Sequence, residues 1–191
     1  SKEKLISIDL ETCDTQLTTH GSGWATKNGY VTGIAVATAN WEGYYPIAHN
    51  GGNLDKTKVL DWFKTVAKLD CPKIFHNASY DIGWLKSLGI TVNGKVHDTM
   101  ISSALLDENR YSYTLNSLAK DKLGRTKNED LLIAAAKEFG VDPKKEMYKL
   151  PSMHVGEYAE YDARLTYDLY LLNKEEIQKQ ELEDIYDLET R

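Results

Sequence analysis

The chain has 191 residues, of which 41% are hydrophobic and 27% are charged, and its formal net charge is −6. These values are typical of a single globular domain of ordinary size, and they exclude a disordered or fibrous chain. The acidic balance argues against a stand-alone nucleic-acid-binding module, because such modules depend on many lysine and arginine contacts to phosphate. An enzyme whose bound cations supply positive charge remains compatible with it.

No apolar run approaches the roughly 20 residues needed to cross a bilayer. The first segment, SKEKLISI, lacks the long apolar core of a signal peptide. We therefore expect a cytosolic protein with no membrane partner. Cys13 and Cys71 show neither a metal-binding nor a redox spacing, so we expect two free thiols.

The first half of the chain predicts strands separated by helices. Alternating apolar residues indicate a strand at 5–12, whereas the stretch 13–30 is rich in glycine and threonine without periodicity, which favours a long loop or hairpin. Further along, the patterns predict strands at 31–39, 43–49 and 72–75, and helices at 54–69 and 79–89.

The second half predicts mostly helices, at 98–106, 112–123, 128–140 and from about Ser152 onward. Strands followed by helices, with some alternation between them, indicate an α/β domain with one mixed sheet. We place the domain at 1–172. The last stretch, 173–191, predicts a charged connector helix with a sparse apolar stripe.

Asp9 and Glu11 lie two positions apart in the first strand, so their side chains point to the same face. The same tripeptide, Asp-Leu-Glu, recurs at 187–189, but residues i and i+2 of a helix do not share a face. On its own, the first pair is better explained as a solvated strand end.

A second acidic position follows the short strand at 72–75. Asn77 is a suitable N-cap for a helix that begins near Ala78, and Asp81 then lies in the first turn, where the helix dipole favours an ionised carboxylate. Acidic residues are common in first turns, so this position alone indicates no site. Asp98 is expected to cap the next helix, or else to support a site indirectly by contacting residues that form it.

A third acidic position lies in the long helix, where Tyr158 and Asp162 are one turn apart on one face. Apolar or small residues share that face, which predicts that it points inward: Val155, Ala159, Thr166 and Leu169. A buried ionised aspartate is costly unless something compensates its charge. The alternative is that Asp162 lies at the domain rim and contacts water.

Four carboxylates brought together repel one another, and each raises the pKa of the others. Divalent cations remove this penalty, and Mg²⁺ prefers carboxylate oxygen together with water and substrate phosphate. Two such ions about 3.5–4 Å apart can clamp the attacking and leaving oxygens of a phosphodiester displacement. The pattern is therefore typical of a metal-dependent nuclease.

The three motifs, Asp9-x-Glu11, Asn77-x₃-Asp81 and Tyr158-x₃-Asp162, resemble those of the DEDD exonuclease superfamily in its tyrosine branch. The histidine branch would need a histidine at position 157, which is glutamate. The segment 97–124 resembles the 3′→5′ proofreading domains of family A DNA polymerases, and 43–53 resembles phage versions in particular. The end of the chain is similar to the junction with the polymerising domain.

The resemblance implies a ribonuclease H-like fold, with a mixed five-stranded sheet flanked by helices. It implies two divalent ions, Mg²⁺ with Mn²⁺ as a substitute, and a role for each motif residue. Asp9 would bridge both ions, Glu11 and Asp162 would complete the first site, and Asp81 would hold the second ion through water. Tyr158 would orient the attacking water.

The resemblance further implies that Thr12 and Asn77 contribute to substrate binding. The substrate would be a single-stranded or frayed DNA 3′ end, since a mismatched terminus unpairs at lower cost. Trp24, Tyr30, Tyr111 and Tyr113 are candidates for stacking on bases, although packing against the domain is the simpler explanation for each. We expect a monomeric fragment of a chain that also carries a polymerase domain.

Two alternatives remain open. The catalytic motifs do not distinguish ribose from deoxyribose, so an exonuclease that trims RNA 3′ ends is the second hypothesis. The third is a catalytically silent nuclease fold that serves as a docking module, against which the complete set of four acids and a tyrosine argues.

Overall fold

The computed structural model describes residues 4–126 and 129–190. Its centre is a five-stranded mixed sheet with the strand order β3-β2-β1-β4-β5. β1 pairs antiparallel with β2, which pairs antiparallel with β3, whereas β4 and β5 run parallel to β1. The strands are β1 (Ile6–Cys13), β2 (Tyr30–Thr38), β3 (Trp41–Pro46), β4 (Lys73–Phe75) and β5 (Val96–Asp98).

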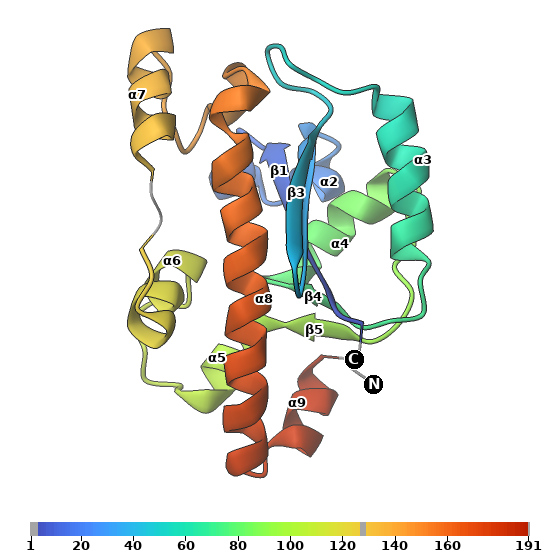
Figure 1. The fold of residues 1–191 in the computed structure, drawn as a ribbon, viewed down its shortest axis with the longest axis vertical. Coiled ribbons are helices and arrows are strands. Elements are labelled where there is room, and N and C mark those ends of the chain that lie inside the picture. The colour runs from blue at the N-terminus through green and yellow to red at the C-terminus, as the bar shows by residue number, and fades with distance from the viewer. Residues whose placement is uncertain (1–3, 127–128, 191) are drawn as a thin grey trace.

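Helices cover both faces of this sheet, and the long helix α8 runs the length of one face while α3 and α4 lie on the other side (Figure 1). The α-helices are α1 (Leu17–His20), α2 (Gly23–Thr26), α3 (Lys56–Ala67), α4 (Ala78–Ser87), α5 (Thr99–Leu106), α6 (Leu115–Leu118), α7 (Asp130–Phe139), α8 (Gly156–Lys179) and α9 (Glu183–Glu189). The expected mixed five-stranded sheet flanked by helices is confirmed.

The alternation of β1 decides which side chains enter which layer. Ile6, Ile8 and Leu10 are buried in the core between the sheet and the α3–α4 side. The intervening residues, including Asp9 and Glu11, therefore point to the opposite face, where α8 packs. A central strand in this way presents two carboxylates to a helix rather than to bulk solvent.

The inward face predicted for the long helix is confirmed. Val155, Ala159, Ala163 and Thr166 are fully buried, and the small side chains at 159 and 163 let α8 approach the sheet beside Ala35 and Ile74. Their spacing of three and four residues is that of one helical stripe. Because Asp162 belongs to the same stripe, it is carried inward with it.

Several elements differ from the predictions. The stretch 13–30, expected to lack regular structure, contains the short helices α1 and α2 before β2 begins. The helix expected at 112–123 consists of α6 and a π-helical turn at Ala119–Leu123. The helix expected at 128–140 is α7, with residue 128 outside the described part of the chain. Short 3₁₀ turns at Met147–Lys149 and Ser152–His154 precede α8.

The predicted connector at 173–191 is not one helix. Residues 173–179 continue α8, the chain then turns at Glu181, whose φ is 56°, and α9 folds back toward β5. Residue 191 lies outside the described part. The stripe expected along the connector is split, because Ile177 is buried while Ile185 and Leu188 are 47% and 62% exposed.

Both cysteines are free thiols, as expected, with Cys13 buried and Cys71 partly buried. Among residues 4–126 and 129–190, the structure contains no helix with the length and apolar character that a membrane span requires.

Candidate metal centre

The two carboxylates of β1 have small neighbours on the adjacent strand. Asp9 lies opposite Ala35 of β2, and Glu11 lies opposite Gly33. Directly opposed residues of an antiparallel pair have Cβ atoms about 4.5–5.5 Å apart, so a large residue at either position would fill the space beside the carboxylates. Alanine and glycine leave that space open for other groups.

The helix α8 supplies the third carboxylate. Asp162 is 7% exposed, and one oxygen each of Asp9, Glu11 and Asp162 lie within 4.8 Å of one another. These three residues come from the first strand and the last long helix. The predicted convergence of the first and third motifs is therefore observed, with Asp9 and Glu11 partly exposed and Asp162 buried.

Asp81 lies beside this group but is not one of its three members. It is in the first turn of α4, as predicted, and is 4% exposed. Burial raises the pKa of its carboxyl well above the usual value, and the charges of Asp9, Asp98 and Glu11 raise it further, while a hydrogen bond from the Leu10 amide acts in the opposite direction. Asp81 of the second motif is thus close enough to Asp9 and Glu11 of the first motif to be affected by their charges.

The start of α4 corrects one expectation. Asn77 occupies the N-cap position, but its side chain makes no capping bond and its backbone is left-handed, with φ 66°. Its side-chain oxygen instead accepts from the Ser79 hydroxyl at 3.2 Å. The capping acceptor for α4 is Asp98, whose carboxylate accepts from the amides of Asn77 and Ala78 at 3.1 and 2.7 Å.

Tyr158, one turn before Asp162, is partly buried at the same place. Burial raises the pKa of its phenol, and the charges of Asp162, Glu11 and Asp9 raise it further. The hydroxyl therefore keeps its proton at neutral pH and acts as a hydrogen-bond donor or acceptor, not as a base.

The sequence analysis did not identify Tyr44 of β3, which lies in the same field. Burial and the charges of Glu11 and Asp9 raise the pKa of Tyr44. Its hydroxyl lies 2.5 Å from Nε2 of the buried His49, and its ring lies over Gly33, where a side chain would overlap it. The segment 43–49 predicted a strand, but nothing in it indicates which tyrosine faces the carboxylates.

Thr12 follows the carboxylate pair at a register shift of β1. Its hydroxyl lies 2.9 Å from the Tyr80 hydroxyl, which donates to Asp14 at 3.0 Å. Burial raises the pKa of Tyr80 to about 12, so this phenol stays protonated. Thr12 is thus already engaged in a hydrogen-bonded chain that links β1 to α4, and its expected role toward substrate stays a prediction.

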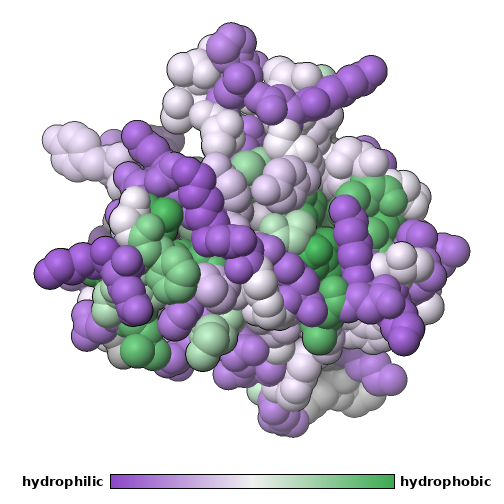
Figure 2. Space-filling view, turned by 90° about the horizontal axis from the view of Figure 1, so that it is seen from above, coloured by the Kyte–Doolittle hydropathy of each residue, from purple (hydrophilic) through white to green (hydrophobic). Residues whose placement is uncertain are grey.

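The candidate stacking residues differ in exposure. Tyr111 is fully exposed, Tyr30 is 43% exposed and Trp24 is 38% exposed, whereas Tyr113 packs in part against the core at Leu115. The end of the molecule seen from above is largely hydrophilic, and its apolar side chains gather in separate patches rather than one surface (Figure 2). The coloured residues of that face thus show no single large apolar docking area.

The donor set fits a hard divalent cation. All the converging groups are carboxylate oxygens, the ligands that Mg²⁺ and Mn²⁺ take, and no described histidine or cysteine belongs to the group. The raised pKa of Asp81 also shows that the uncompensated charge is costly. The residues present can therefore hold metal.

Comparison with known proteins decides the family. A family model described as 3′–5′ exonuclease matches residues 1–177. The chain belongs to the 3′–5′ exonuclease family of DNA polymerases. The resemblance to family A proofreading domains is thereby confirmed, as is the exonuclease class of the domain.

Two relatives illustrate the relation. The chain is 37% identical over 194 residues to a DNA-directed DNA polymerase of Pseudomonas phage M6, covering 98% of this chain and 29% of the relative. It is 29% identical over 180 residues to DNA polymerase I of Pseudomonas aeruginosa, covering 88% of this chain and 18% of the relative. The chain thus spans less than a third of the length of either relative.

The fold recurs in solved structures. Brucella melitensis NrnC with bound Mg²⁺ superposes with a TM-score of 0.66 at 17% identity, over 98% of this chain and 80% of that one. At this identity the likeness shows the fold alone. It confirms the expected ribonuclease H-like architecture.

Proposed function

We propose that this domain hydrolyses single-stranded or frayed DNA 3′ ends, one nucleotide at a time, and that it proofreads for a polymerase domain on the same chain. The observation that carries the proposal is the approach of Asp9, Glu11 and Asp162 to within 4.8 Å, with the buried Asp81 beside them. Family membership supports the reaction class. The length of the relatives supports the polymerase partner.

Four carboxylates are proposed to hold the cations. Asp9, Glu11 and Asp162 would hold one divalent cation, and Asp9 and Asp81 would hold a second, with Mg²⁺ the proposed ion and Mn²⁺ its substitute. When bound, such ions activate water and stabilise the charge that develops on the phosphate.

Tyr158 orients the attacking water. Because its pKa is raised, its phenol holds its proton and can direct a water by a hydrogen bond but cannot remove a proton from it. Asn77 and Thr12 are proposed to contact the terminal nucleotides, and the exposed Trp24 and Tyr30 are proposed to stack on unpaired bases. Such stacking tolerates any sequence, as proofreading requires.

The domain is proposed to span 1–172, with 173–191 leading toward the polymerase domain. Phage relatives favour action in the cytoplasm of an infected host. The fragment is proposed to be a monomer.

One assay tests the proposal. End-labelled single-stranded DNA is incubated with the protein in Mg²⁺, in Mn²⁺ and in chelator, next to an RNA of the same sequence. We expect a ladder of shortened DNA products that requires the cation and is lost in Asp9→Ala and Asp162→Ala. Asp61→Ala, which changes an exposed acid of α3, is the control for altered charge.

Three results would overturn the proposal. Faster cleavage of RNA than of DNA would favour the RNA-trimming exonuclease. No cleavage of either strand with Mg²⁺ or Mn²⁺ would favour a silent docking module. Near-normal activity of Asp9→Ala or Asp162→Ala would show that the site is elsewhere.

A further inference from the structure

Asp98, the last residue of β5, joins the starts of two helices. It is 3% exposed, and one carboxylate oxygen accepts from the amides of Asn77 at 3.1 Å and Met100 at 2.8 Å. The other oxygen accepts from the Ala78 amide at 2.7 Å. Hydrogen bonds to an ionised acceptor are roughly twice as strong as neutral ones. One carboxylate thus fixes α4 and α5 relative to each other.

The start of α4 depends on this contact. Asn77 has a left-handed backbone and offers no side-chain cap of its own, so the free amides of the first turn are satisfied from β5. Asp81 follows within the same turn, close enough to Asp9 and Glu11 for their charges to raise the pKa of its carboxyl. A displacement of this turn would move the Asp81 carboxylate away from the other two.

A simple cap would not need a charge here. Asp98 adds a negative charge near Asp81, which is unfavourable because the two carboxylates repel. Serine, threonine or asparagine would cap one helix without this cost. Only a carboxylate, however, offers two acceptor oxygens, and an asparagine would turn its NH₂ group toward one of the donating amides. The residue type therefore fits the task of bridging two helices.

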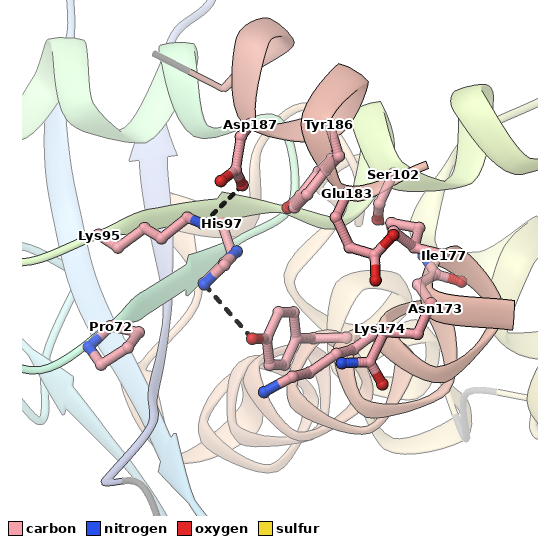
Figure 3. A pocket seen from close by; sticks show the side chains of 12 residues that line it. Pro72, Lys95, His97, Ser102, Asn173, Lys174, Ile177, Glu183, Tyr186 and Asp187 are labelled. Carbon is pink, nitrogen blue, oxygen red and sulfur yellow. Dashed lines mark hydrogen bonds and ion pairs between the residues drawn. The ribbon is translucent and has the colours of Figure 1, made fainter. Parts of the chain in front are cut away.

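The same residue is contacted by the C-terminal helix. Tyr186 of α9 is 5% exposed, and its hydroxyl accepts from the backbone N–H of Asp98 at 3.0 Å. Its ring stacks on His97 with centroids 5.9 Å apart and an interplanar angle of 8°. Figure 3 shows Tyr186 and Asp187 on α9 beside β5, at the edge of a pocket of about 370 Å³ between α9 and the end of α8.

We propose that Asp98 is a positioning residue of the metal centre, which holds Asp81 in place through the first turn of α4, and that Tyr186 links α9 to it. This inference rests on the proposed function, since it concerns the same cation site. It follows that the orientation of α9, which packs back against β5, affects how tightly the cation binds.

The test measures Mn²⁺ binding to the protein by calorimetry, beside the Mn²⁺ dependence of DNA cleavage. Asp98→Asn should weaken Mn²⁺ binding by about 10- to 100-fold, as is usual for residues that support metal ligands. At saturating Mn²⁺, its cleavage rate should recover much of the loss. Tyr186→Phe removes the two hydrogen bonds between the phenol and the Asp98 backbone and should weaken binding by about fivefold.

Two variants serve as matched controls. Asp55→Asn makes the same change at the N-cap of α3, where the carboxylate accepts from the Lys58 amide at 3.1 Å. Lys95→Ala removes the exposed ion pair between Lys95 and Asp187, which also holds α9 but does not touch Asp98. Both should bind Mn²⁺ within about twofold of the wild type, since exposed pairs contribute little.

The outcomes separate the two proposals. If the wild type binds no Mn²⁺, the proposed function fails. If the wild type binds Mn²⁺ and Asp98→Asn binds it equally well, the positioning role is overturned. If circular dichroism shows that Asp98→Asn is unfolded, Tyr186→Phe decides, and binding equal to that of the wild type again overturns the role.

Discussion

The candidate metal centre contains carboxylates, whose charge is costly to bury, and the phenol of Tyr158, which keeps its proton. Three carboxylates surround Tyr158, and together with burial they raise its pKa. A base must lose its proton at working pH, which this tyrosine does not do. We therefore predict that its contribution is geometric, through the position in which it would hold a water molecule.

Replacing Tyr158 by phenylalanine should lower the rate of DNA cleavage by about 10- to 100-fold, because a misplaced water loses the advantage of orientation. The variant should bind Mn²⁺ as tightly as the wild type. The ratio of the wild-type cleavage rate to that of Tyr158→Phe should stay constant from about pH 7 to about pH 9.5. Steady-state measurements in saturating cation can check this. Tyr167→Phe, on the same helix but outside the centre, is the control.

A rate ratio that grows by about tenfold for each pH unit would contradict this role, because it would mean that the ionised phenol acts as a base.

The raised pKa of Asp81 predicts a gain in stability when its charge is removed. An acid whose pKa is higher in the folded state contributes stability at low pH, and the contribution is lost as the pH rises through the folded-state value. At neutral pH the buried carboxylate therefore destabilises the cation-free protein. Asp81→Asn should raise the melting temperature in chelator at pH 7.5, and scanning calorimetry can measure this.

The gain should shrink as the pH is lowered, because the wild-type carboxyl then binds its proton. Asp61→Asn, at an exposed position of α3, should leave the melting temperature unchanged. A lower melting temperature for Asp81→Asn at neutral pH would show that its hydrogen bond from Leu10 outweighs its buried charge.

At the scale of elements, two glycines lie beside Tyr44 where β2, β3 and α8 pack, but only Gly33 must lack a side chain. A Cβ atom at Gly33 would overlap the phenol ring, whereas a Cβ atom at Gly156, the first residue of α8, would lie at an ordinary 3.8 Å from it. A side chain is therefore tolerated at position 156 but not at position 33, although both glycines approach the same ring.

Gly33→Ala should destabilise the fold by about 1–3 kcal/mol, because the ring of Tyr44 must move and its bond to His49 is strained. Gly156→Ala should be neutral or stabilising by up to about 1 kcal/mol, since alanine favours the helix. Urea denaturation of the two variants makes the comparison. Equal stability of both would show that Tyr44 can be displaced freely.

Periodicity was sufficient to predict the long elements. The helices α3, α4, α5 and α7 and the strands β1 and β2 lie within a few residues of the predicted ranges, because each has one buried face. α1 and α2 were missed, since helices of four residues show no periodicity. The break after α8 was missed because the charged residues that follow it favour a continuing helix equally well.

The candidate site was predictable in part. Asp9, Glu11, Asp81 and Asp162 follow from motif spacing, which fixes the face of each element. Tyr44 and the double cap at Asp98 were not predictable, because they depend on which strands become neighbours in the sheet. Local spacing cannot supply that information.

At the scale of the whole molecule, a net charge of −6 and a cluster of carboxylates make stability dependent on cations. A ligand that binds only the folded state stabilises it by RT ln(1 + [L]/Kd), which is about 2.7 kcal/mol at a concentration of 100 Kd. Mn²⁺ should therefore raise the melting temperature, and chelator should reverse the shift. NaCl at equal ionic strength, which only screens charge, should have a much smaller effect.

Equal shifts with Mn²⁺ and NaCl would contradict a specific site. A full Mn²⁺-induced rise in melting temperature in the double variant Asp9→Asn, Asp162→Asn would also contradict a specific site. These residues lie far apart in the sequence, on β1 and α8, and both belong to the group of converging oxygens.

The carboxylates of β1 leave the ribosome early in translation, but their partner on α8 emerges only after the helices α3 to α7 have been made. A growing chain therefore carries an incomplete set of ligands for most of its synthesis. Under the proposed function, which needs all of these ligands, the nascent chain would be inactive until its last long helix docks. Folding would thus delay the proposed cleavage of nucleic acid.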